Sequence, residues 1–238
     1  MLPYRSFNAH LRERFGVRVQ RIGIDAGFTC PNIDGTRGRG GCLFCGAAGS
    51  LAGYQDSALS IEEQIARGIE RLGKRTRAGA FIAYFQSFTA TREPPERLAP
   101  LLERALAADP RIAGLAVGAR PDCLAEPMLD LLESFHRRTY LWIDAGLETP
   151  NDETLRRINR RCTTAEFADS MRRAKARGLL VCAHIIFGLP GDGPQDRRGA
   201  IDLVNALGLD GVKIHNLYID AGAPMANLWR RGQVPLPS

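Results

Sequence analysis

The segment FTCPNIDGTRGRGGCLFCG, residues 28–46, contains three of the six cysteines of the chain and decides how the rest is interpreted. Cys30, Cys42 and Cys45 are spaced Cys-x11-Cys-x2-Cys, and four glycines lie between the first two cysteines. This composition is not typical of a core strand or helix. Glycine permits positive φ and the close approach of other atoms, so we expect a loop that bends around a ligand. We call residues 28–46 the cysteine loop.

Three thiolates on one loop favour a soft metal centre, either zinc or an iron–sulfur cluster. Structural zinc is usually closed by two ligand pairs, but this sequence has one Cys-x2-Cys and no second such pair or His-x3-His. Three cysteines therefore favour a [4Fe–4S] cluster with one iron free for a further ligand. Zinc and a metal-free loop remain alternatives. Disulfides are disfavoured, because the N-terminus (MLPYRSFNAHLRERFG) lacks an apolar secretory segment, which also predicts a cytoplasmic protein.

Length and composition are those of an ordinary globular chain. With 238 residues, 45% hydrophobic and 24% charged, the sequence fits a single α/β domain over residues 1–238. No apolar run approaches the roughly 20 residues that cross a bilayer, so we expect no membrane partner. The net charge of +6, mostly from arginine, permits an anionic partner such as RNA without requiring one.

The N-terminal part of the chain has a helix pattern followed by a strand pattern. Tyr4, Phe7, Leu11 and Phe15 recur at spacings of three and four, which predicts a helix over residues 4–15 packed on one end of the domain. Alternating apolar and polar residues predict a strand over residues 17–24 that leads directly into the cysteine loop.

Beyond the cysteine loop, strand and helix patterns alternate. Ser60 and Glu63 form a capping-box signal for a helix. Further strands are predicted at residues 80–85, 112–117, 140–144, 179–187 and 211–217, and further helices at residues 95–107, 126–136, 165–177 and 195–207. Six β/α units indicate an α/β fold, a partial (β/α)6 TIM-like barrel over residues 17–217. The active site is expected at the carboxyl ends of the parallel strands.

Polar and glycine-rich residues follow the predicted strands, as such a site requires. Residues 86–89 (QSFT), 118–122 (GARPD), 144–149 (DAGLET) and 188–192 (GLPGD) each follow one strand. The sixth strand carries Lys213, His215 and Leu217 on one face. Residues of this kind at one rim of a sheet are hard to explain by packing alone.

The pattern GFTCPN-x-DG-x-x-G-x-GGC-x-FC, residues 27–45, resembles the cluster loop of radical S-adenosylmethionine (radical SAM) enzymes. Specifically, it resembles the YhcC-like family, which is similar to the radical SAM domain of the Elp3 elongator subunit. The usual spacing is Cys-x3-Cys-x2-Cys, and the longer first gap is a feature of this branch. Phe44, before the last cysteine, also fits. The resemblance extends from about residue 4 to residue 217, and relatives continue further, so residues 218–238 are interpreted as a tail that a truncation would explain.

The resemblance implies a set of cofactor contacts. Cys30, Cys42 and Cys45 would bind the [4Fe–4S] cluster. The expected cofactor-binding residues for SAM are Gln86, Ser87, Arg120, Asp122, Glu148, Gly188 and Gly191. The first two lie where the family binds the SAM amino group, and Glu148 lies where it binds the ribose. The two glycines would admit the adenine.

Several of these assignments have structural alternatives. The QSFT segment could be a surface turn. Arg120 could bind a SAM carboxylate or fix its loop by bonding Asp122. Asp144 stands where relatives have Glu, so its shorter side chain puts direct SAM contact in doubt. Asp192 is expected to cap the next helix.

Residues outside the cofactor set give weaker signals. His184 and His215, near the ends of neighbouring strands, are the catalytic candidates, although a lone histidine is more often a core residue. Cys123, Cys162 and Cys182 are expected to pack as small hydrophobes. Seven arginines are either a solvated helix face or a phosphate-binding patch near the barrel mouth: Arg156, Arg157, Arg160, Arg161, Arg172, Arg173 and Arg177.

These observations predict an enzyme that cleaves SAM to a 5′-deoxyadenosyl radical with an electron from a donor such as flavodoxin or ferredoxin. Similarity to Elp3 makes tRNA, at a wobble uridine, the first substrate to consider. Alternatives are a small metabolite or a protein as substrate, or a non-catalytic zinc-binding module.

Overall fold

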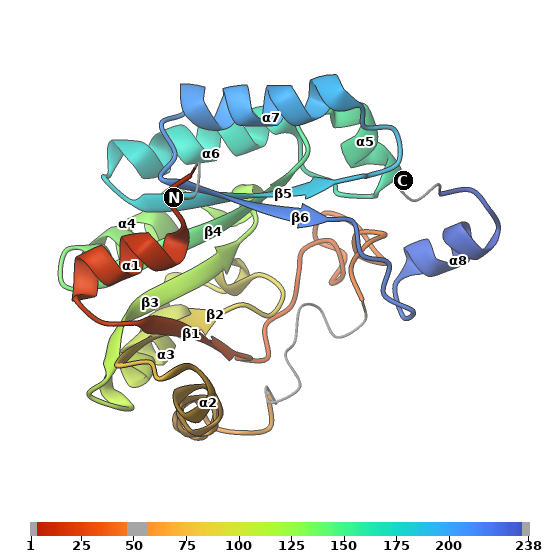
Figure 1. Ribbon diagram of the computed structural model, residues 1–238. Helices are drawn as coiled ribbons and strands as arrows, with labels where there is room; N and C mark the ends of the chain where they lie inside the picture. Colours follow the sequence, from red (N-terminus) through yellow and green to blue (C-terminus); the bar gives the residue numbers. More distant parts are fainter. Residues whose placement is uncertain (1–3, 47–56, 235–238) are drawn as a thin grey trace.

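The computed structural model describes residues 4–46 and 57–234, which form one curled sheet with helices on its outer face (Figure 1). The six strands pair in sequence order and all neighbours are parallel. They are β1 (Val19–Ile24), β2 (Ala80–Phe85), β3 (Ile112–Ala119), β4 (Tyr140–Glu148), β5 (Leu180–Phe187) and β6 (Gly211–Asn216). The sheet curls into a half-barrel that is open between β1 and β6, which confirms the predicted α/β partial barrel.

The first helix precedes β1, the last follows β6, and the helices between them connect successive strands, as parallel pairing requires. They are α1 (Phe7–Phe15), α2 (Ile61–Thr76), α3 (Pro95–Ala107), α4 (Glu126–His136), α5 (Asp152–Arg157), α6 (Thr164–Ala176), α7 (Pro194–Ala206) and α8 (Pro224–Arg230). Two short 3-10 helices, at Ala90–Arg92 and Pro121–Cys123, follow β2 and β3. Ser60 and Glu63 form the expected capping box of α2.

The main core lies between the sheet and the outer helices. Its largest side chains include Phe81 of β2, Phe135 of α4 and Phe167 of α6, each at most 2% exposed. A second cluster lies inside the half-barrel at the amino ends of the strands, where Leu11 of α1 packs with Trp142. The helix α1 therefore closes that end, as the sequence predicted, and leaves the carboxyl ends of the strands for the site.

Two strands are longer than predicted. β3 continues to Ala119 and β4 to Glu148, so the tails expected after these strands are partly strand. The β4–β5 register shifts between Gly146 and Glu148, and Glu148 has a φ of 65°. Apolar periodicity could not predict this, because polar residues continue the backbone pairing through the bulge.

Helices α5 and α8 were not assigned from the sequence. Both are short, and α8 packs in a small cluster with α5 rather than on the main core. Asp192 does not cap α7 as expected: Gly193 is the N-cap, and Asp196 accepts a hydrogen bond from its amide. None of the helices in the described ranges is long and apolar enough to span a membrane.

Candidate active site

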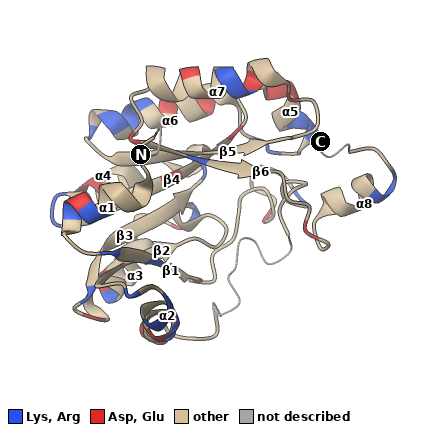
Figure 2. Ribbon diagram, in the orientation of Figure 1, with Lys and Arg blue, Asp and Glu red and all other residues tan. Residues whose placement is uncertain are grey.

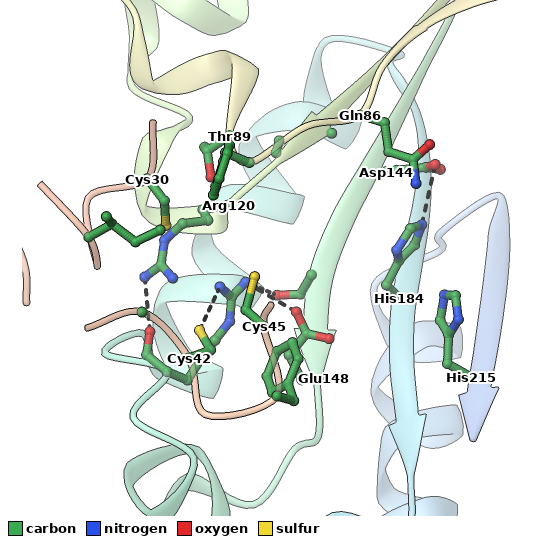
Figure 3. A pocket seen from close by; sticks show the side chains of 18 of the residues that line it. Cys30, Cys42, Cys45, Gln86, Thr89, Arg120, Asp144, Glu148, His184 and His215 are labelled. Atoms are coloured by element: carbon green, nitrogen blue, oxygen red, sulfur yellow. Dashed lines mark hydrogen bonds and ion pairs between the residues drawn. The ribbon is translucent and has the colours of Figure 1, made fainter. Parts of the chain in front are cut away.

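A single open pocket collects most of the chemically distinctive residues at the carboxyl ends of the strands (Figure 3). It is lined by side chains from the cysteine loop and from β2 to β6. Its polar members are Cys30, Cys42, Cys45, Tyr84, Gln86, Thr89, Arg120, Asp144, Glu148, Arg160, His184, Lys213 and His215. The sequence thus predicted the right edge of the sheet for these groups.

The cysteine loop is a series of tight backbone turns. The carbonyl of Cys30 accepts hydrogen bonds from the amides of Ile33 and Asp34, and the amide of Cys45 donates to the carbonyl of Cys42. Gly38 has a specific role, because a Cβ there would lie 2.3 Å from the side-chain oxygen of Asn32. The glycines therefore allow the loop to fold back on itself.

The segment after α5 holds the cysteine loop against the barrel. Asn159 donates from its side chain to the carbonyls of Arg39 and Gly41, at 3.2 and 2.8 Å. In the other direction, the side chain of Asn32 donates to the carbonyl of Asn159. The amide of Leu43 donates to the carbonyl of Ile158 at 2.9 Å. Four polar contacts thus fix the loop from a segment more than a hundred residues away in sequence.

Arg160, the next residue, connects the loop to β4. It is 6% exposed, donates to the Gly146 carbonyl at 3.0 Å and pairs with Glu148 at 3.4 Å. It also donates to Sγ of Cys42 at 3.9 Å. Burial lowers the pKa of Arg160, but the negative charges of Glu148 and Cys42 outweigh this and raise it overall. Arg160 is therefore a permanent positive charge beside the cysteine loop.

The sulfur donors suit a multi-iron cluster better than a single ion. Within residues 4–46 and 57–234, only Asp144, Cys182 and His184 have ligand atoms all within 4.8 Å of one another, so the loop cysteines are spaced more widely. Burial, together with the neighbouring loop cysteines, raises the pKa of Cys45 to about 11. A cationic centre would offset both effects and hold the thiolates. The donor set therefore fits a [4Fe–4S] cluster bound by three cysteines.

Arg120 is bonded to Asp122, as the structural alternative for this residue requires. Its Nε and Nη2 donate to the two carboxylate oxygens at 2.9 and 3.0 Å, and Nη2 also donates to the Arg160 carbonyl. Its Nη1, however, is buried and has no hydrogen-bond partner in the described part of the chain. Arg120 lines the pocket and Asp122 does not. One donor of Arg120 therefore remains for a ligand.

The other expected SAM contacts divide into two groups. Gln86 and Glu148 line the pocket, whereas Ser87, Gly188 and Gly191 are not among its lining residues. Ser87 is buried, and its hydroxyl has no partner in the described residues. The backbone at Gly191 has a φ of 103°, and a Cβ there would lie 2.6 Å from Nη1 of Arg157, so this glycine permits close packing on α5.

Asp144 anchors a second polar group inside the barrel. Its carboxylate accepts from Nη1 of Arg21 at 2.6 Å and from Nε1 of Trp142 at 2.9 Å, and Nε2 of His184 lies 3.3 Å away. Burial raises the pKa of Asp144, but the contacts with His184 and Arg21 outweigh it and leave the pKa well below its usual range. The carboxylate of Asp144 is therefore ionised and already bound by neighbouring side chains of the protein.

His215 lies next to His184, with 5.5 Å between the ring centroids. Burial, Lys213 and His184 together lower the pKa of His215 to about 4. Its folded-state pKa lies below the unfolded value of about 6.5, so the unfolded chain binds more protons between these values. We expect stability to rise with pH from about 4 to about 6.5, and His215→Gln to flatten part of this rise.

The direct check is an NMR titration of the histidine side chains in the metal-free protein. The resonance that is absent from the His215→Gln variant should titrate with a midpoint near 4. A midpoint near the ordinary value of about 6.5 would contradict the burial of this ring.

The arginine group does not form one patch. Arg160 is buried beneath the cysteine loop, and Arg173 and Arg177 near the end of α6 pair with Glu126 of α4. Basic and acidic residues are mixed on the outer helices (Figure 2). Because α6 runs antiparallel to the strands, its last turns lie away from the pocket. For Arg173 and Arg177 the ion pairs therefore favour the solvated-face alternative over the phosphate-binding patch.

Of the three remaining cysteines, Cys162 and Cys182 are buried and Cys123 is half-buried. Burial is the main cause that raises the pKa of Cys162 to about 11 and those of Cys123 and Cys182 to about 12.

Sequence reasoning missed the roles of Asn159 and Arg160. The polar residues of the INRR segment after α5 were a signal in the sequence. Nothing in the local sequence, however, showed that this segment folds back under the cysteine loop.

Comparisons with known proteins identify the family of the chain. The radical SAM superfamily matches residues 33–204. The chain is 39% identical over 229 residues to YhcC of Escherichia coli strain K12, covering 96% of this chain and 72% of that protein. It is 37% identical over 233 residues to YtqA of Bacillus subtilis strain 168, covering 97% and 71%. The chain therefore spans about 70% of these relatives.

Among solved structures, the archaeal Elp3 of Methanocaldococcus infernus has a TM-score of 0.67 and 17% identity, covering 91% of this chain and 50% of that chain. This likeness establishes the fold. The chain belongs to the radical SAM superfamily, as a member of its YhcC-like family. Enzymes of this superfamily use a [4Fe–4S] cluster and SAM, so the zinc-module alternative is set aside.

Proposed function

We propose that the pocket binds SAM beside a [4Fe–4S] cluster held by Cys30, Cys42 and Cys45, and that the enzyme modifies a wobble uridine of tRNA in the cytoplasm. The observation that carries the cofactor part is the arrangement of three widely spaced cysteines at the mouth of a pocket that also contains an unpaired arginine donor. Cys30, Cys42 and Cys45 would hold a cluster whose chemistry is the one-electron reduction of SAM, which would give methionine and a 5′-deoxyadenosyl radical.

The chain's own residues would bind and orient the cofactor. Nη1 of Arg120 would donate to the SAM carboxylate, because it is the one donor of that side chain left without a partner among the described residues. Gln86 would meet the amino group, and Glu148 the ribose hydroxyls. His184 and His215 would face the substrate across the pocket from the cysteines (Figure 3). The other expected cofactor-binding residues would act indirectly, through their backbone atoms or by holding their loops in place. They are Ser87, Asp122, Gly188 and Gly191.

Two observations support tRNA as the substrate. The fold is similar to that of Elp3, and the chain carries a net charge of +6, which favours a polyanion. The ion pairs of α6 neutralise part of the basic surface. An electron donor such as flavodoxin or ferredoxin would supply the reducing equivalent.

The substrate test compares wobble nucleosides in tRNA from a strain that lacks the gene with those in tRNA from the parent strain. The proposal expects a nucleoside that accumulates in the deletion strain and is converted when that tRNA is incubated with the purified, reconstituted enzyme and SAM. Identical nucleoside profiles would overturn the tRNA assignment and direct the search to small metabolites or proteins.

The cluster assignment gives a separate prediction. Cys42→Ser should lose most of the bound iron and sulfide after anaerobic reconstitution, because a serine hydroxyl is a poor replacement for a thiolate ligand. Cys123→Ala is the matched control, since this thiol lies outside the pocket lining, and it should retain the cluster. Iron and sulfide analysis with the visible absorption spectrum measures both. Equal iron content in the two variants would contradict the assignment of Cys42.

A further inference from the structure

The inner wall of the half-barrel opposite the cysteines carries a basic group that the cofactor assignment does not use. Lys213 and His215 alternate along β6, so both face the interior, while Val212 and Ile214 are exposed on the outer face. In the strand register, His184 of β5 is paired with Lys213. All three line the same pocket as the cysteine loop.

Among the lysine and arginine side chains of the pocket lining, only Lys213 has no ion-pair partner in the described part of the chain. Arg120 pairs with Asp122, and Arg160 pairs with Glu148. Asp144, the remaining acidic residue of the lining, is taken by Arg21. No hydrogen bond or ion pair joins Lys213 to any residue within the described ranges, and Asp144 acts on it only as a more distant negative charge. The pocket therefore contains an excess positive charge that is partly buried, a state that an anion would stabilise.

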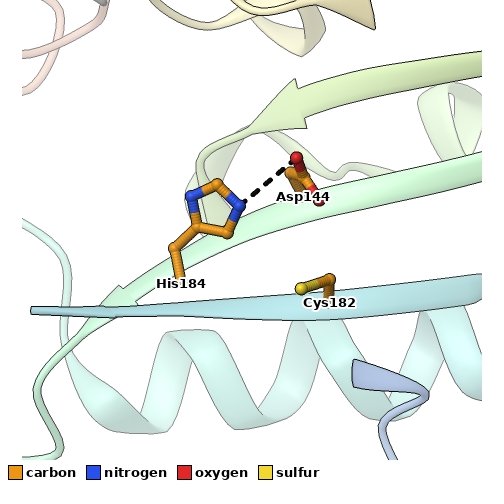
Figure 4. Close-up of side chains that lie close together, drawn as sticks. All are labelled: Asp144, Cys182 and His184. Atoms are coloured by element: carbon orange, nitrogen blue, oxygen red, sulfur yellow. Dashed lines mark ion pairs between the residues drawn. The ribbon is translucent and has the colours of Figure 1, made fainter. Parts of the chain in front are cut away.

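A metal ion does not account for this group. Asp144, Cys182 and His184 bring their ligand atoms within 4.8 Å of one another (Figure 4). Both oxygens of Asp144 already accept hydrogen bonds, from Arg21 and Trp142. A cation at this position would displace the Arg21 guanidinium and lie close to Lys213. The charges in this part of the pocket favour an anion.

We propose that Lys213 and His215 form a subsite that binds an anionic group of the substrate, a carboxylate or a phosphate. The proposal rests on the proposed function, since it takes this pocket to be the substrate site. The ammonium supplies the charge, and a ring nitrogen of His215 supplies a directional donor to the same anion. The neighbouring pair of His184 and Asp144 forms the boundary of the subsite on the side of β5.

The chain offers a direct test, because it contains only three lysines, Lys74, Lys175 and Lys213. The reconstituted holoprotein of 238 residues is treated with an amine-acylating reagent, and labelling of each lysine is followed by peptide mass spectrometry. Acetate and phosphate are the probes, with chloride at equal ionic strength as the control. Lys74, an exposed residue paired with Glu70, reports any general effect of the anions on the reagent.

A probe at ten times its dissociation constant should slow the labelling of Lys213 about tenfold, because only about one site in eleven is then free. The labelling of Lys74 should not change. Protection by acetate alone identifies a carboxylate subsite, and protection by phosphate alone identifies a phosphate subsite. In the His215→Gln variant, the concentration that gives half protection should rise several-fold.

Three outcomes would overturn the subsite. They are no protection beyond chloride, protection that is unchanged in His215→Gln, and full protection by SAM alone with no further effect of the anions. The last outcome would assign Lys213 to the cofactor. SAM cleavage is measured on the same sample. Protection of Lys213 without any cleavage would remove the proposed function and leave the anion site standing, whereas cleavage without protection would remove only the subsite.

Discussion

Arg160→Met should lower the free energy of unfolding of the metal-free protein by about 3–5 kcal/mol, the cost expected when one partner of a buried ion pair is removed. The variant leaves the carboxylate of Glu148, 8% exposed, without its arginine. It also removes the hydrogen bonds to the Gly146 carbonyl and to Cys42. Methionine fills a similar volume, so the loss reports mainly charge and hydrogen bonding rather than a cavity.

Anaerobic urea unfolding of the reduced, metal-free protein measures this difference. Arg156→Met is the matched control, because this arginine is exposed and pairs with Glu153 on the surface; its cost should stay below about 1 kcal/mol. Adding Glu148→Gln to Arg160→Met should restore part of the loss, since no buried charge then remains unpaired. If Arg160→Met costs no more than Arg156→Met, the anchoring role of Arg160 is wrong.

The second large effect is expected at Arg21, which pairs with Asp144 inside the barrel. Arg21→Met should cost about 3 kcal/mol at neutral pH, because it leaves a carboxylate that is 3% exposed without its closest cation. The guanidinium also lies over the rings of Phe7 and Tyr84, at 4.4 and 4.9 Å from the centroids. The variant therefore weakens the contact between α1 and the sheet as well.

The pH dependence distinguishes the charge effect from lost packing. In the wild-type protein the pKa of Asp144 is held below its unfolded value, so its contribution is present at neutral pH and is lost as the carboxyl becomes protonated in acid. The cost of Arg21→Met should therefore be fully present at neutral pH and shrink as the pH falls below the unfolded value of 3.8. Thermal unfolding from neutral pH to below this value measures it, with the exposed Arg104→Met as control. A cost independent of pH would mean that packing, not charge, explains the loss.

The sequence predicted the order of elements well, because that order depends on local periodicity and capping. The six strands, the capping box at Ser60 and the helix that closes the amino ends of the barrel are all signalled by residues close together in the chain. The end of β4 was placed too early, because polar residues at a bulge interrupt the apolar pattern but not the backbone pairing. The end of β3 was also placed too early, because Gly118 and Ala119 were grouped with the polar tail but still pair with β4.

The site was predicted only as far as its location. The strand ends predicted which edge of the sheet carries it, and the cysteine spacing indicated the kind of metal centre. Which arginine faces inward could not be predicted. Arg160 and Arg156 belong to one charged run, yet the first is buried beneath the cysteine loop and the second is exposed, because the chain turns at Asn159, which has a φ of 55°. That turn is fixed by contacts more than a hundred residues away in sequence.

The central claim is that this pocket binds a [4Fe–4S] cluster and SAM together, and reductive SAM cleavage tests it most directly. The protein is reconstituted anaerobically with iron and sulfide, reduced with dithionite and mixed with SAM. Methionine and 5′-deoxyadenosine are then measured alongside the electron paramagnetic resonance spectrum. We predict a change in the cluster spectrum on addition of SAM and formation of both products. A cluster whose spectrum is unchanged by SAM, with neither product formed, would contradict the account.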